Sequence, residues 1–161
     1  MKRTTVRTIV LCALAVLWAG LIFGFSSQSG EASAAVSEGF MNPFSRILTA
    51  LLGEAGHTFV RKGAHFFLYA VLMILMVSAY RSAGGRRPLL CPLSICVLYA
   101  VSDEIHQCFV PGRACRAYDV CVDALGCLAG ALLLWLAREA IGRIRVKKVH
   151  HGKPCNKEKS I

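Results

Sequence analysis

Four stretches of the chain have the length of a helix that crosses a lipid bilayer. A hydrocarbon core about 30 Å thick needs about 20 mostly apolar residues, and the stretches of this kind are 8–25, 63–80, 89–109 and 119–137. The third is polar at its end and the fourth at its start. The whole chain is 55% hydrophobic and only 17% charged, too apolar for an ordinary soluble domain. We therefore expect an all-α integral membrane protein, a bundle of four transmembrane helices.

The first stretch, TIVLCALAVLWAGLIFGF, is either a retained anchor or a cleaved signal peptide. The basic leader KRTTVRT and the Ala-x-Ala-like site in SGEASAA fit a signal peptide. However, the stretch is longer than the usual apolar region of about 7 to 15 residues, and that site lies well beyond its end. We expect a retained anchor.

Basic residues are distributed unevenly beside the four stretches. Fourteen of the 19 lysines and arginines lie before the first stretch, between the second and third, or after the fourth. Cytoplasmic flanks carry this excess in membrane proteins, so both termini are expected in the cytoplasm. The chain then divides into a cytoplasmic N-terminus (1–7), a membrane domain (8–137) and a basic tail (138–161). The net charge of +10 is explained by this topology and by anionic lipids, without a nucleic-acid partner.

Ionisable residues recur at one depth near the outer ends of three stretches. His65, Asp103 and Asp123 each lie 15 or 16 residues from the arginine at the cytoplasmic end of their stretch, about 22 to 24 Å along a helix. The polar end of the first stretch, 26–28, reaches a similar level. A charge facing lipid would cost about 2.5 to 3.5 kcal/mol. The polar faces should therefore turn toward one another and form an outward-facing pocket.

The residues of this pocket suggest two kinds of chemistry. Imidazole and buried carboxylates can exchange protons, and the candidate catalytic residues are His65, Asp103, Glu104, His106 and Asp123. A guanidinium binds phosphate or carboxylate through two parallel hydrogen bonds, and the candidate anion-binding cations are Arg61, Lys62 and Arg113. The supporting candidates on the same helical faces are Gln107, Asp119 and Tyr69.

Several interpretations of the pocket remain open at this point. Histidine with carboxylates suits zinc or manganese, but no HExxH-like signature indicates a metal, and a salt-bridged cluster would use the same residues. No Ser-His-Asp order supports covalent catalysis, so neither an enzyme nor a cofactor is specified. The leading hypothesis is binding or modification of an anionic envelope lipid or cell-wall precursor. The alternatives are a small transporter or proton relay, disfavoured by apolar inner helix halves, and a non-catalytic partner of envelope enzymes.

The first outer loop, 26–60, contains the pattern of a short amphipathic helix. Asn42-Pro43 fits an N-cap followed by proline at the first helical position. The apolar residues that follow recur at helical spacing and are Phe44, Ile47, Leu48, Leu51, Leu52 and Ala55. We expect a helix on the outer surface, either a lid or a loop helix packed on the bundle.

Small residues and cysteines bear on packing in the outer half. Gly126 and Gly130 form a small-xxx-small pattern, which allows two membrane helices to approach closely. Three cysteines lie on or near the outer side, and a disulfide among them requires an oxidising compartment. These cysteines are Cys108, Cys115 and Cys121, and the sequence alone does not determine which two of them would form the disulfide.

Four motifs occur in succession along the chain: FSSQSG, RKGAHFFLYAVL, SDEIHQCFVPGR and DVCVDALGCLAG. Together they resemble the VanZ-like family, small bacterial membrane proteins named for a teicoplanin-resistance protein, over about residues 20–135. The resemblance implies an integral protein of the bacterial envelope, linked to glycopeptide susceptibility. The positions that it carries over are Arg61, Lys62, His65, Asp103, Glu104, His106, Gln107, Pro111, Gly112, Arg113, Asp119, Asp123 and Gly126.

Overall fold

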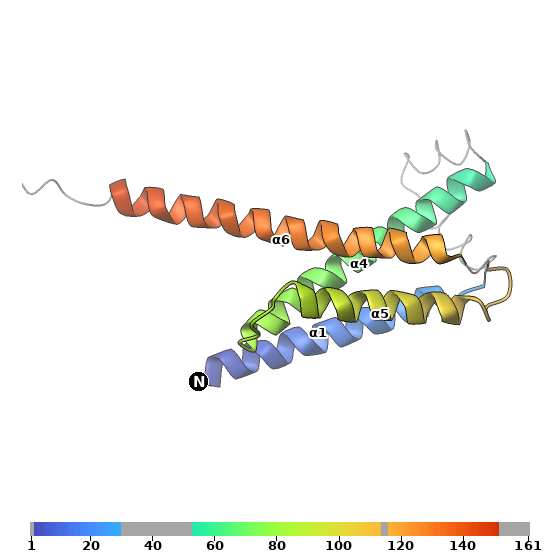
Figure 1. Ribbon diagram of the computed structural model, residues 1–161, viewed down its shortest axis with the longest axis horizontal. Coiled ribbons are helices and arrows are strands. Elements are labelled where there is room, and N and C mark those ends of the chain that lie inside the picture. Colours follow the sequence, from blue (N-terminus) through green and yellow to red (C-terminus); the bar gives the residue numbers. More distant parts are fainter. Residues whose placement is uncertain (1, 30–52, 114–115, 152–161) are drawn as a thin grey trace, which may run out of the picture. The chain divides into compact units, whose positions relative to one another are not determined.

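Helices account for the regular secondary structure of the described chain, which comprises residues 2–29, 53–113 and 116–151 of a computed structural model. The helices are α1 (Lys2–Ser26), α4 (Glu54–Ser82), α5 (Leu90–Gln107) and α6 (Ala117–His151) (Figure 1). The expected all-α class is therefore confirmed. The chain divides into two compact units, 1–131 and 132–161. The second contains the remainder of α6, so the tail expected after residue 137 begins as helix.

Three of these helices are long and apolar enough to cross a membrane. The segments with this property are Thr4–Ser26, Thr58–Ser82 and Ala117–Ile144. The fourth expected span corresponds to α5, which is not among these segments. It has only 18 residues, and its last residues are polar. The bundle of four transmembrane helices remains a prediction.

Large apolar side chains project from the outward faces of the helices. Leu17 on α1 is 70% exposed, Phe67 on α4 is 62% exposed and Leu98 on α5 is 68% exposed. A soluble protein rarely exposes so many large apolar side chains, because each Å² of apolar surface in water costs about 25 cal/mol. In lipid the same surface costs nothing, so these faces identify a membrane protein.

The start of α4 differs from the sequence prediction. We expected the second span at 63–80, but the helix begins at Glu54. Gly53 precedes it with a φ of 56°, a left-handed conformation that glycine adopts without a steric penalty. Ala55, predicted as the last apolar residue of the loop helix, belongs to α4 instead. The rest of that predicted helix, 42–52, lies outside the described residues.

Side-chain hydrogen bonds show that α1 runs antiparallel to α4. Near the start of α1, the Thr8 hydroxyl donates to the hydroxyl of Ser82 at 2.9 Å, where α4 ends. Further along α1, the Trp18 indole donates to the Leu68 carbonyl at 2.9 Å. The start of α1 and the end of α4 therefore lie on one side of the first unit.

α5 lies beside α1 and runs in the same direction (Figure 1). The Tyr99 hydroxyl donates to the Ala19 carbonyl at 2.6 Å, and Asp103 accepts a hydrogen bond from Ser26 at 2.7 Å. Higher numbers on α5 thus meet higher numbers on α1. The polar ends of α1 and α5 are brought to the same level, which is the level expected from residue counting.

Two glycines bring α6 into backbone contact with α4. A Cβ atom added at Gly126 would collide with the Phe66 carbonyl oxygen, and one added at Gly130 would collide with that of Ala70. The close helix approach that the small-xxx-small pattern predicts is present. Since Asp123 lies one turn before Gly126, this contact also places Asp123 against α4 at the level of His65.

Replacing Gly130 by alanine tests this contact. The added methyl should lower the thermal midpoint of the purified protein, because overpacking of this kind typically costs about 1 to 3 kcal/mol. Gly20→Ala is the matched control, since a Cβ there meets nothing within 4 Å and alanine favours a helix. Equal midpoints for the two variants, measured by thermal unfolding in detergent, would contradict the contact.

Candidate functional site

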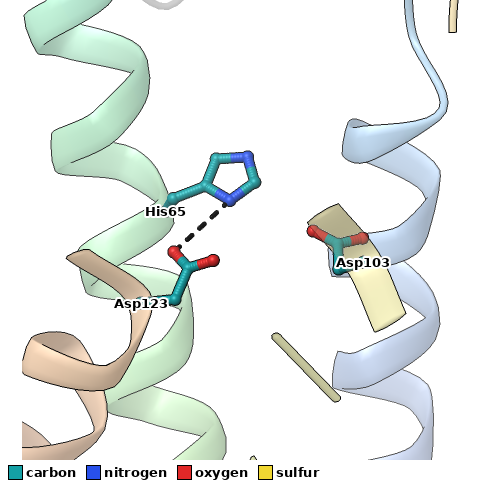
Figure 2. A group of neighbouring side chains, drawn as sticks. All are labelled: His65, Asp103 and Asp123. Atoms are coloured by element: carbon teal, nitrogen blue, oxygen red, sulfur yellow. Dashed lines mark ion pairs between the residues drawn. The ribbon is translucent and has the colours of Figure 1, made fainter. Parts of the chain in front are cut away.

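Three ionisable side chains from three helices of the first unit converge near the polar ends of α1 and α5. They are His65 on α4, Asp103 on α5 and Asp123 on α6 (Figure 2). One ligand atom from each lies within 4.8 Å of the other two. Figure 2 shows His65 and Asp123 on one side of the cluster with Asp103 facing them from the other. The helices therefore place together the three residues that share one depth in the sequence.

A hydrogen-bond network from two helices fixes Asp103, whose surface is only 2% exposed. Its Oδ2 atom accepts from the Ser26 hydroxyl at 2.7 Å and from the Gln107 amide at 3.0 Å. The Gln107 amide also lies 3.3 Å from the Ser26 hydroxyl oxygen. The Oδ1 atom of Asp103 has no hydrogen-bond partner among the described residues. One oxygen is thus held firmly while the other is left available.

Asp123 and His65 form the opposite side of the cluster. Asp123 is 3% exposed, and its Oδ1 atom lies 3.7 Å from Nδ1 of His65. The imidazole is stacked against Tyr69, with ring centroids 6.5 Å apart. Tyr69 is fully buried, and its hydroxyl has no partner in the described part of the chain. The supporting role predicted for Tyr69 corresponds here to packing against the histidine ring.

A pocket opens beside this cluster. Its lining residues are Arg61, Lys62, His65, Gln107, Asp119, Val122 and Asp123. Lys62 forms an ion pair with Asp119 and lies over the ring of Tyr118, 4.4 Å from its centroid. Arg61 is half-buried, and the structure gives it no hydrogen bond or ion pair with the residues that it describes. Two predicted anion-binding cations therefore line the pocket, and one of them, Arg61, has no partner in the part of the chain that the structure describes.

Arg113 makes a different set of contacts. Gly112, with a φ of 74°, turns the chain before it. The Arg113 guanidinium then donates to the Gln28 carbonyl at 2.9 Å, to Gln107 Oε1 at 2.9 Å and to the Phe25 carbonyl at 2.8 Å. Burial lowers the pKa of Arg113, but a guanidinium remains charged at neutral pH. These bonds tie the C-terminal end of α1 to that of α5, and Arg113 does not line the pocket.

Glu104 and His106 also lie outside the pocket lining. Glu104 is buried, and its Oε1 atom accepts a hydrogen bond from the Arg116 backbone N–H at 2.6 Å. His106 is stacked on Phe23 with ring centroids 4.5 Å apart, and its Nε2 atom lies 3.1 Å from the Ser27 hydroxyl. Their catalytic roles remain predictions, since the contacts seen here join the helix end to its neighbours.

Ser26 belongs to the site although it was not among the candidate residues. It is fully buried, and its hydroxyl bonds directly to Asp103. A serine at the end of an apolar stretch is common, so its type carries little information. The signal that could have identified it was depth, because 26–28 reach the level of the other polar residues.

We call the cluster of His65, Asp103 and Asp123 the floor, although of these only His65 and Asp123 line the pocket, and we call the two cations one turn earlier on α4, Arg61 and Lys62, the mouth. Such a floor can exchange protons or hold a cation, and such a mouth can bind an anion. Ser26 donates its hydroxyl proton to Asp103 but is fully buried and does not line the pocket, so it is not placed to attack a ligand there. The geometry therefore favours binding chemistry over acyl transfer.

Comparison with known proteins gives one match. The family model described as VanZ/LLP1 matches residues 11–138, a range that contains all of the site residues named above. None of the curated proteins and none of the solved structures matches the chain significantly.

Replacing Arg113 by lysine should destabilise the protein although the charge is kept. Lysine lacks the planar fork that reaches three acceptors at once, and each hydrogen bond to a charged group contributes about 1.5 to 3 kcal/mol. Arg116→Lys is the matched control, since the Arg116 side chain is exposed. Unfolding in detergent should show a clear loss for Arg113→Lys alone, and equal stability of both variants would refute the proposed tie between α1 and α5.

Proposed function

The chain belongs to the VanZ/LLP1 family, and from this premise we propose that it is a multi-pass protein of the bacterial envelope whose pocket binds an anionic ligand. The ligand class is the phosphate or carboxylate group of an envelope lipid or a lipid-linked cell-wall precursor. Binding such a precursor would connect the pocket with the glycopeptide resistance for which the family is named. The unpaired cation Arg61 is the observation that carries the proposal.

Arg61 differs from Lys62 and Arg113 in having no acceptor among the described residues. Lys62 is neutralised by Asp119, and Arg113 donates to two carbonyl oxygens and an amide oxygen. The positive charge of Arg61 also repels that of the Arg113 guanidinium. A half-buried, uncompensated charge at the level of a membrane is costly. An incoming anion would remove this cost and gain charge-assisted hydrogen bonds.

The surroundings of the pocket favour an amphiphilic ligand over a free ion. Phe59, two residues before Arg61 on α4, is 64% exposed, and Tyr118 beside Lys62 is exposed to the same extent. Aromatic residues of this kind are typical of the membrane interface, at the level of lipid head groups. A ligand with its anionic group at Arg61 could lay its hydrocarbon chain along the apolar faces of α4.

The core inward of the cluster supports ligand binding rather than transport. Its most buried described side chains are apolar, and they are Leu72, Met73, Val77, Cys96 and Ala100. A proton or solute path would require polar groups or water at this depth. The described part of the chain offers a site that is open at one end.

We place the pocket on the outer face of the membrane, with both termini in the cytoplasm and α5 as a fourth span. The basic asymmetry supports this orientation. The parallel pairing of α5 with α1, a helix apolar enough to cross, supports a transmembrane α5. Cys108, which follows α5 directly, is disulfide-bonded, and disulfides are typical of oxidising compartments outside the cytoplasm.

Reporter fusions on either side of α5 test this topology. An enzyme active only outside the cytoplasm should give signal when fused after Gly53 or Gly112 and none when fused after Gly85, because α4 and α5 would each reverse the side. Equal signals after Gly85 and Gly112 would mean that α5 does not cross. Signal after Gly85 alone would invert the orientation.

Replacing Arg61 by glutamine should weaken binding of an anionic isoprenoid lipid. The probe is farnesyl diphosphate, with neutral farnesol for comparison, and binding is measured by native mass spectrometry of the protein in detergent. Loss of one charged contact of about 1.5 to 3 kcal/mol predicts at least a tenfold weaker affinity for the diphosphate. Teicoplanin tolerance of a susceptible bacterium expressing the protein should fall in parallel.

Arg86→Gln is the control for this variant. Arg86 is an exposed cation of the loop between α4 and α5, so its removal changes the net charge equally without touching the pocket. Equal affinity for farnesyl diphosphate and farnesol, or equal losses in the two variants, would refute Arg61 as the anion-binding residue.

A further inference from the structure

The floor of the pocket carries more negative than positive charge. Asp103 and Asp123 are each at least 97% buried, and His65 is the only described side chain of the cluster that can become a cation. Protonation of one imidazole can balance one carboxylate and no more. Of the two cations that line the pocket, Lys62 is engaged by Asp119, and among the described residues no ion pair joins Arg61 to Asp103 or Asp123. Taking an unbalanced carboxylate out of water costs several kcal/mol.

The available oxygen of Asp103 marks where a balancing cation would sit. Its Oδ2 atom is held by Ser26 and Gln107, which fixes the direction of the carboxylate, while Oδ1 has no hydrogen-bond partner among the described residues. Buried polar atoms almost always have a partner in protein, water or an ion. Across the cluster, the side chains of His65 and Asp123 face Asp103 (Figure 2).

We infer that His65, Asp103 and Asp123 together bind a divalent metal ion of the zinc or manganese class. Their ligand atoms lie within 4.8 Å of one another. Ligands at about 2.0 to 2.2 Å from a tetrahedral ion lie roughly 3.3 to 3.6 Å apart. His65 and Asp123, at 3.7 Å, are close to this separation, and side-chain movements of about an ångström would complete the set. One imidazole nitrogen with carboxylate oxygens suits zinc or manganese better than calcium or magnesium, which prefer oxygen alone.

Ligation by these residues accounts for features that an ion-pair cluster leaves unexplained. A divalent ion neutralises both carboxylates at once, and it gives Asp103 Oδ1 a partner. The bonds from Ser26 and Gln107 become the outer contacts that orient a ligating carboxylate. Three protein ligands leave further coordination positions open. His65 and Asp123 also line the pocket, so these positions face the ligand-binding space.

The metal site does not depend on the proposed anion binding, because it rests on the floor residues and not on Arg61. The ion is tested on the full-length protein, purified in detergent and stripped with EDTA. Manganese binding is followed by electron paramagnetic resonance, and zinc uptake by elemental mass spectrometry after dialysis. We expect one tight site per chain, and a rise in thermal midpoint on adding either ion, because an ion that binds only the folded state stabilises it.

Two variants locate the ion. Asp103→Asn keeps the size of the side chain and should weaken manganese binding by more than about tenfold, since loss of even an outer partner of a metal ligand has this effect. Asp119→Asn is the matched control, because Asp119 is an acid of the same pocket that pairs with Lys62. It should bind manganese as the unmodified protein does.

Ion binding and the thermal midpoint of the unmodified protein test the inference even if a variant fails to fold. No tight ion and no thermal shift with millimolar manganese or zinc would overturn the inference. Equal binding by Asp103→Asn, Asp119→Asn and the unmodified protein would mean adventitious ions and would overturn it as well. Loss of binding confined to Asp119→Asn would place the ion at the mouth of the pocket, contrary to the assignment.

Discussion

The backbone contact between α6 and α4 is the constraint on which the rest of the site depends. Gly126 and Gly130 have no side chain to separate the helices, and any Cβ would collide with a carbonyl of α4. Membrane helices gain little from the hydrophobic effect against one another, so close packing of this kind is a main source of their association. The contact fixes the rotation of α6, and this rotation turns Asp123 toward His65 instead of lipid.

A second constraint joins α1 to α5 through polar side chains. Ser26, Gln107 and Arg113 form one continuous network that ends on Asp103. Arg113 also satisfies carbonyl oxygens at the end of α1, which the helix cannot satisfy itself. In a membrane such groups have little access to water, so the network both terminates α1 and orients the carboxylate. The residues that join the two helices are thus also those that orient a ligand of the proposed metal site.

The charges of the pocket are arranged by depth. Carboxylates and an imidazole form the floor, and cations form the mouth, where Lys62 is paired with Asp119 and Arg61 has no partner among the described residues. A divalent ion on the floor and an anionic head group at the mouth would each compensate a charge that the protein leaves unbalanced. The two proposals are thus complementary, since an anion at the mouth would also face the open positions of the metal.

The sequence by itself determined the helices, the membrane class and the common depth of His65, Asp103 and Asp123, because hydropathy and a rise of about 1.5 Å per residue are local properties. The family followed from its motifs.

Only the tertiary structure decided which charges are paired. From the sequence, Arg61, Lys62 and Arg113 were equivalent candidates for anion binding. In the structure, Arg113 donates hydrogen bonds to backbone carbonyl oxygens, which every residue possesses and which no sequence pattern identifies as acceptors. The start of α4 at Glu54 was missed for a similar reason, since Gly53 in a left-handed conformation permits an earlier helix than hydropathy indicates. Pairing depends on separations of a few ångströms, and these are set by helix rotation and packing, not by residue type.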